Sequence, residues 1–129
     1  MKRVIVMNLL IVLFSIGAAN AQKAEVLYFK ADLGCCQART CDFIEKQVKQ
    51  VVKENYKNDD VVFRQVKLAD KANAELVKKH KAKSQTVVIV NTQGSEKVTD
   101  VTSIVKQYSR SKDKDELEDK LITAIKETL

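Results

Sequence analysis

The sequence predicts an α/β fold in which a mixed four-stranded sheet is flanked by helices, and three observations support this. Short apolar runs rich in β-branched residues alternate with stretches of helical periodicity. Residues 86–90 are almost wholly apolar, which is typical of a central strand. The turn-forming residues 91–95 lead directly into another strand-like run, so these two strands should be antiparallel. The predicted order is β-α-β-α-β-β-α.

The first half of this order contains two strands and two helices. Residues 26–29 are an apolar run of strand formers, and residues 61–68 form the second predicted strand. A helix is expected from about Thr40 to Tyr56. Its apolar positions follow the spacing i, i+4, i+7, i+8 and are Ile44, Val48, Val51 and Val52. A shorter helix over about 70–81 is expected to bury Ala72, Leu76 and Val77.

The second half contains a hairpin and a C-terminal helix. The hairpin pairs residues 86–90 with the strand that begins at Lys97. Asp113 and Glu116 form a candidate capping box for the helix. The stripe that this helix should bury is Leu117, Leu121, Ile122 and Ile125. With the first two strands parallel through a right-handed crossover, this is the order of a thioredoxin-like fold.

The N-terminus has the pattern of an export signal. Lys2 and Arg3 precede an apolar run over residues 4–17, and Ala19-Asn20-Ala21 is a typical cleavage site. We therefore predict that residues 1–21 are a signal peptide and that residues 22–129 form one thioredoxin-like domain. The expected location is periplasmic or extracellular, with no stable membrane span after cleavage.

Charge and composition argue against nucleic-acid binding. Removing Lys2 and Arg3 lowers the formal net charge from +6 to +4. Lysines and acidic residues alternate along the predicted helices, as is usual for solvated faces. Aromatic residues make up 5% of the chain and are not interleaved with basic ones, so no nucleic-acid partner is expected.

All three cysteines lie in the seven residues Cys35–Cys41, between the first strand and the first helix. This junction is where α/β folds place chemistry. We expect Cys41 in the first turn of the helix, where the helix dipole and the nearby Arg39 would lower the pKa of its thiol. Cys35 and Cys36 are expected in a preceding loop begun by Gly34.

Three functions are compatible with this cluster. Cys35, Cys36 and Cys41 could bind one soft ion such as Cu(I), zinc or trivalent arsenic; the absence of a fourth Cys or His from the cluster argues against closed tetrahedral zinc. Alternatively, Cys41 pairs with Cys36 or Cys35 in a redox-active disulfide that exchanges with a thiol or disulfide partner protein. In the third case the disulfide is structural, within an interaction module. No other cofactor is required.

The stretch from Val26 to Cys41, followed by Asp42-Phe43-Ile44-Glu45, resembles an exported bacterial thioredoxin-like family, the ArsF or nitrophenyl compound nitroreductase subunit family. The resemblance extends over nearly all of residues 22–129. It implies a redox partner subunit of a reductase. That family has C-x-x-C before Ile-Glu; here Cys41 matches the second cysteine, and Ala38 stands in place of the first.

The spacing Cys-Cys-x4-Cys is similar to that of the arsenic metallochaperone ArsD family, which is also thioredoxin-like. There a Cys-Cys pair and a third cysteine bind trivalent arsenic, so the resemblance implies the same role for Cys35, Cys36 and Cys41. Those chaperones are cytosolic, which the predicted signal peptide does not match. Binding or relay of a soft metalloid is the leading hypothesis, and a catalytic role would be that of a thiol–disulfide oxidoreductase.

Thioredoxins also place a cis-proline before the strand that corresponds to residues 86–90. This chain has no proline, and Ser84 or Gln85 takes that place, so a trans peptide is expected. His80, the single histidine, is predicted to be exposed or to cap a helix. Asp32 is predicted to be a turn residue, although it could accept a bond from the thiols.

Overall fold

The computed structural model describes residues 22–32 and 35–129, and the side chains of residues 35–37 are also outside the description. The predicted signal peptide over residues 1–21 therefore lies outside the described residues. The elements in chain order are β1 Ala24–Lys30, α1 Cys35–Asn55, β2 Val61–Lys67, the 3-10 turn η1 Lys71–Asn73, α2 Ala74–Lys79, β3 Val87–Asn91, β4 Val98–Asp100, α3 Thr102–Ser111 and α4 Lys114–Thr128.

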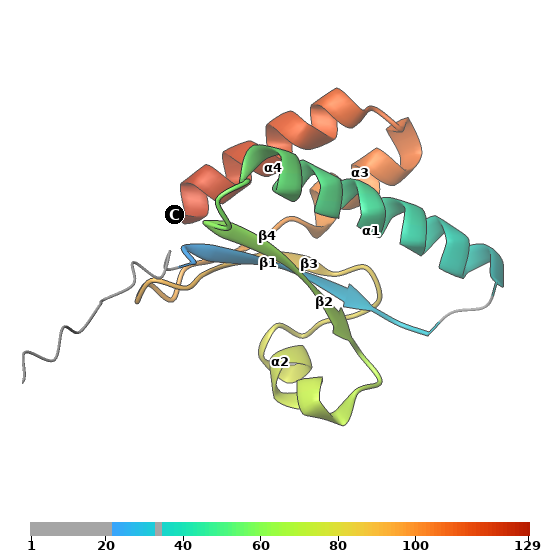
Figure 1. Cartoon of the computed structure of the whole chain (residues 1–129). Helices are drawn as coiled ribbons and strands as arrows, with labels where there is room; N and C mark the ends of the chain where they lie inside the picture. Colours follow the sequence, from blue (N-terminus) through green and yellow to red (C-terminus); the bar gives the residue numbers. More distant parts are fainter. Residues whose placement is uncertain (1–21, 33–34) are drawn as a thin grey trace, which may run out of the picture.

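The four strands form one mixed sheet in the order β2-β1-β3-β4. β1 pairs with β2 in parallel and with β3 in antiparallel, and β3 pairs with β4 in antiparallel. Figure 1 shows α1, α3 and α4 on one face of the sheet and α2 on the other. The predicted mixed four-stranded sheet flanked by helices, including the parallel first pair, the central third strand and the final hairpin, is confirmed.

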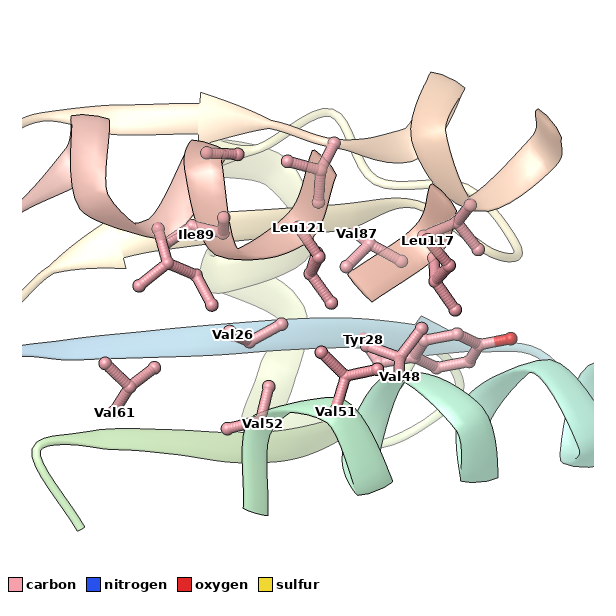
Figure 2. Packing of buried hydrophobic residues seen from close by; sticks show 14 of the residues in the cluster. Val26, Tyr28, Val48, Val51, Val52, Val61, Val87, Ile89, Leu117 and Leu121 are labelled. Carbon is pink, nitrogen blue, oxygen red and sulfur yellow. The ribbon is translucent and has the colours of Figure 1, made fainter. Parts of the chain in front are cut away.

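The side chains of the central strands belong alternately to two apolar clusters, because successive residues of a strand point to opposite faces of the sheet. Val26 and Tyr28 of β1 face the large helices, whereas Leu27 and Phe29 face α2. In Figure 2 the predicted valines of α1 and the leucines of α4 meet over β1 and β3. The residues of these two helices that are buried in the cluster are Ile44, Val48, Val51, Val52, Leu117, Leu121, Ala124 and Ile125.

The C-terminal part contains two helices, where the sequence predicted one. α3 was missed because its β-branched residues Thr102, Ile104 and Val105 resemble a continuation of the preceding strand. It ends at Lys112, whose φ of +58° is left-handed. The predicted cap of the next helix is present, since the backbone N–H of Glu116 donates to the Asp113 carboxylate at 3.0 Å. Of the predicted stripe, Ile122 alone is half-buried.

The segment predicted as a helix over about 70–81 is a 3-10 turn followed by the six-residue α2. Asp70 caps the turn by accepting the backbone N–H of Ala72 at 3.0 Å. The prediction that Ala72 is buried is wrong, because it lies in this exposed turn. Leu76 and Val77 are half-buried against the smaller cluster.

Candidate functional site

Cys41 is the seventh residue of α1 and only 4% exposed. The prediction that it lies in the first turn of the helix is wrong, because α1 begins at Cys35. Gln37, Ala38 and Arg39 are good helix formers, and they allow the helix to start earlier than its apolar pattern indicates. The unpaired N–H groups of the helix N-terminus therefore belong to residues before Cys41.

The backbone of Cys35 and Cys36 forms the start of α1, so their expected placement in a loop is wrong. In a continuous helix with a rise of about 1.5 Å per residue, Cys36 and Cys41 are about 7.5 Å apart along the axis. A disulfide needs Cα atoms within about 7 Å of each other. A disulfide between Cys41 and either Cys35 or Cys36 therefore requires the first turn of α1 to unwind. The shared metal site and the redox pair remain predictions, because the side chains of Cys35 and Cys36 lie outside the described residues.

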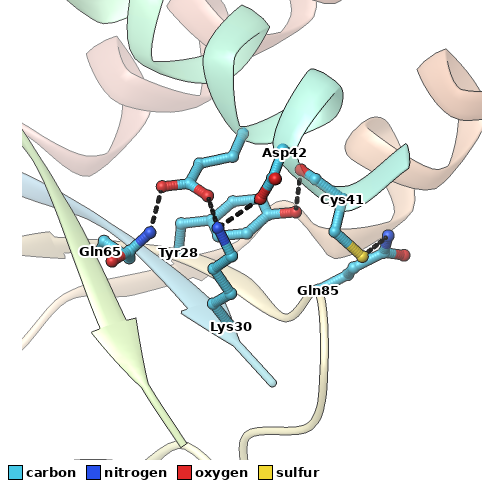
Figure 3. A network of polar contacts seen from close by, with 7 residues as sticks. Tyr28, Lys30, Cys41, Asp42, Gln65 and Gln85 are labelled. Carbon is cyan, nitrogen blue, oxygen red and sulfur yellow. Dashed lines mark hydrogen bonds and ion pairs between the residues drawn. The ribbon is translucent and has the colours of Figure 1, made fainter. Parts of the chain in front are cut away.

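The sulfur of Cys41 faces Gln85, in the loop that leads into β3. The side-chain amide of Gln85 donates to Cys41 Sγ at 2.9 Å, as Figure 3 shows. Two backbone hydrogen bonds hold Gln85 in place. The N–H of Gln85 donates to the carbonyl oxygen of Phe29, and the N–H of Phe29 donates to the carbonyl oxygen of Thr86, both at 2.9 Å. Gln85 has a left-handed φ of +65°, an uncommon conformation for a residue with a side chain. Of the two residues considered at this place, Gln85 contacts the thiol.

Tyr28 supports the same turn of α1 from below. Its side chain is fully buried, and its hydroxyl donates to the carbonyl oxygen of Cys41 at 3.2 Å. Burial raises the pKa of Tyr28 far above its usual range, and the nearby Cys41, Glu45 and Asp42 raise it further. Tyr28 is therefore a neutral donor that ties Cys41 to β1.

A polar cluster lies beside the thiol at the end of β1. Lys30 Nζ forms ion pairs with Asp42 at 2.5 Å and with Glu45 at 3.0 Å, and these hydrogen bonds raise the pKa of Lys30. Gln65 of β2 donates to the other oxygen of Glu45 at 2.5 Å. Figure 3 shows these contacts joining β1, β2 and α1 next to Cys41. This cluster was not predicted from the sequence. The signals in the sequence were the alternation of Lys30 with the inward Tyr28 and the position of Asp42 directly after Cys41.

The weaker candidates lie at the periphery of the site. His80 occupies the C-terminal cap of α2, and its ring packs 5.9 Å from that of Phe29 between centroids. Burial, with a smaller effect of Lys79, lowers the pKa of His80. Asp32 is exposed, and its suggested bond to the thiols remains a prediction.

The described part of the chain contains neither a cluster of metal ligands nor a membrane-spanning helix. Residues 22–32 and 35–129 contain no group of three His, Cys, Asp or Glu side chains that could hold a metal ion. The side chains of Cys35 and Cys36 lie outside these ranges, so the three-thiolate site stays a prediction. No helix in the described ranges is long and apolar enough to cross a bilayer.

No known family model matches this chain, and no curated protein matches it. Among solved structures, one described as a malarial protein is 21% identical, with a TM-score of 0.49, over 83% of this chain and 98% of its own. An uncharacterized thioredoxin-like protein from Clostridium perfringens is 18% identical, with a TM-score of 0.48, over 87% of this chain and 90% of its own. Both similarities concern the fold alone.

Proposed function

We propose that this protein is a thiol redox protein in which Cys41 is the protected sulfur and Cys36 or Cys35 is its partner. One observation carries the proposal: Cys41 Sγ is held by the Gln85 amide at the carboxyl end of β1, in a thioredoxin-like fold. Two more cysteines lie at the start of the same helix. A buried sulfur with a fixed donor is suited to the second, resolving step of an exchange.

The chemistry balances as a two-electron exchange with a disulfide in a partner protein. The thiolate of Cys36 or Cys35 attacks one partner sulfur and releases the other as a thiolate, which leaves a mixed disulfide. Cys41 loses its proton, and its thiolate then attacks the Cys36 or Cys35 sulfur of the mixed disulfide. This step releases the second sulfur of the partner as a thiolate. The partner disulfide is reduced to a dithiol, and two thiols of this protein are oxidised to a disulfide.

The first turn of α1 is the element that must move in this cycle. Helix ends fray readily, because their first N–H groups have no partner within the helix. Cys41, in contrast, is held by Tyr28 at its carbonyl and by Gln85 at its sulfur. The proposed cycle therefore brings an unwinding first turn to a fixed sulfur.

Binding of a soft metalloid by the same cysteines is the second candidate, with trivalent arsenic as the ion that the resemblances to the ArsF and ArsD families favour. The Gln85 contact also supports this candidate, since hydrogen bonds from outer groups orient the ligands of metal sites. An ion held by three thiolates needs all of Cys35, Cys36 and Cys41, whereas a redox pair needs only two of them.

The difference in the number of cysteines gives the test. The test compares fully reduced residues 22–129 with the single variants Cys35→Ser, Cys36→Ser and Cys41→Ser. Each protein is equilibrated in glutathione buffers, and mass spectrometry detects disulfides from the loss of mass. The redox proposal expects one intramolecular disulfide that is lost in Cys41→Ser and in one of the other two variants. A disulfide that persists in Cys41→Ser would contradict it.

The same four proteins, reduced and mixed with arsenite, are then examined by native mass spectrometry. Soft-ion binding expects one ion per chain and a large loss of affinity in all three variants. Equal affinity in wild type and all variants would exclude the second candidate.

A further inference from the structure

The excess positive charge of the described chain lies in one segment. Residues 64–83, here called the basic segment, contain seven Lys or Arg and two Asp or Glu, a formal charge of +5. The remaining described residues contain fourteen basic and fifteen acidic side chains, a formal charge of −1. The net charge of residues 22–129, +4, does not reveal this asymmetry.

The cations of the basic segment are available to a partner. All seven are exposed. Within residues 22–32 and 35–129, the ion pairs of lysines involve Lys23, Lys30 and Lys120, and no cation of the basic segment takes part in one. Charges that are not neutralised within the fold contribute to the field outside it.

Most of the basic segment lies on the less covered face of the sheet, and the segment leads to the thiol. It includes most of β2, η1, α2 and the link to β3, and Figure 1 shows α2 alone on that face. Arg64 of β2 and Lys79 of α2 line one surface hollow of about 280 Å³. Lys83 precedes Gln85 by two residues, and the Gln85 amide contacts Cys41 Sγ at 2.9 Å.

We infer that the basic segment is a docking surface for an acidic protein, which presents its disulfide to the cysteines of α1. This inference rests on the proposed redox function and names the class of its partner. Complementary charge raises the rate of encounter and orients the partner before exchange.

A protein partner fits this surface better than a membrane does. Helices that lie on membranes insert an apolar face with large side chains. Within the described ranges the exposed large hydrophobic residues are Phe43, Val98 and Leu129, and none of them is in the basic segment. α2 itself has only six residues. Charge without an exposed apolar stripe is suited to an acidic protein surface.

The test uses two synthetic peptides with the same disulfide, one flanked by glutamates and the other by lysines. Reduced protein is mixed with each, and the rate of exchange is measured at low and at high salt. We expect exchange with the glutamate peptide to be roughly tenfold faster at low salt, and the difference to shrink as salt screens the charges. In the triple variant Lys79→Gln/Lys81→Gln/Lys83→Gln the preference should be lost.

The control variant removes the same charge from the other side of the molecule. Lys53, Lys106 and Lys126 lie in α1, α3 and α4, are exposed and form no ion pair within the described residues. The triple change of these lysines to Gln should leave the preference unchanged. Equal loss in both triple variants would show that only net charge matters and would overturn the inference.

A last arm separates this inference from the redox proposal. Serine-substituted versions of both peptides cannot exchange, so their binding, followed by fluorescence anisotropy, reports docking alone. If neither disulfide peptide reacts but the acidic serine peptide binds, the redox proposal fails and the docking surface stands. If vesicles with anionic lipid bind the protein and the acidic peptide does not, the docking inference fails.

Discussion

The two faces of the sheet are built differently. On the helix face, α1, α3 and α4 cover a cluster of seventeen buried residues among those described, centred on Val26, Tyr28 and Ile89. On the α2 face, four buried residues, Leu27, Phe29, Val66 and Val88, are covered by half-buried neighbours. The same three strands, β1, β2 and β3, supply buried residues to both faces, so the difference comes from what packs against them.

This difference separates stability from interaction. Burial of apolar side chains stabilises the fold by about 1.5–3 kcal/mol for each large residue, so the helix face carries most of the stability. The α2 face has a thin cover and carries most of the exposed cations of the basic segment. Cys41, in α1 on the helix face, is tied to β1 by Tyr28 and is contacted by Gln85 in the loop that leads from α2 into β3.

The largest expected effect compares the same substitution on the two faces. Leu121→Ala should lower the free energy of unfolding by about 3 kcal/mol, because it leaves a cavity in a close-packed cluster around a fully buried side chain. Leu76→Ala, at a half-buried position on the other face, should cost about 1 kcal/mol. Urea denaturation followed by circular dichroism measures both. Equal losses would contradict the contrast between the faces.

Tyr28→Phe tests the tie between the larger cluster and the thiol. The ring stays buried while the hydrogen bond to the Cys41 carbonyl is lost, so stability should fall by about 1 kcal/mol. The matched change Tyr56→Phe removes a hydroxyl that makes no hydrogen bond within the described ranges, and it should change stability by less than about 0.5 kcal/mol. Urea titration of the two variants side by side decides this.

Gln85→Met tests the contact from the other side, because methionine keeps the length of the side chain and removes the N–H donor. If reduced Cys41 loses a hydrogen bond of about 1 kcal/mol, the dithiol–disulfide equilibrium should shift about fivefold toward the disulfide. Glutathione equilibration measures the shift, and Gln93→Met in the exposed hairpin turn is the control. An unchanged equilibrium would mean that the amide does not act on the sulfur.

The smallest effect concerns pH on the α2 face. Burial lowers the pKa of His80 in the folded protein, so the unfolded chain binds the proton more tightly. The contribution of His80 is fully present above its unfolded pKa of about 6.5 and is lost as pH falls toward the folded value. In His80→Gln, the decrease in urea midpoint between about pH 8 and about pH 5.5 should be smaller than in wild type. An identical decrease would place the pH dependence elsewhere.

The order of the strands and most of the core could be predicted from the sequence. Local apolar patterns identified β1, β2 and β3, and the turn residues 91–95 indicated the hairpin. The stripe of α4 was predicted because helical periodicity is a local property that a packed face preserves. Strand pairing then followed from chain order and short connections.

The start of α1 and the surroundings of Cys41, in contrast, depend on contacts between residues far apart in the sequence. The first turn of α1 has no apolar repeat, so its helical start depends on propensity and packing, which periodicity does not report. Gln85 reaches Cys41 across 44 residues of sequence, and Gln65 reaches Glu45 across 20. Such contacts arise from the pairing of β1 with β2 and β3, which brings distant polar residues to one end of the sheet. The sequence therefore located the thiols, and the packing of the sheet selected the residues that hold Cys41.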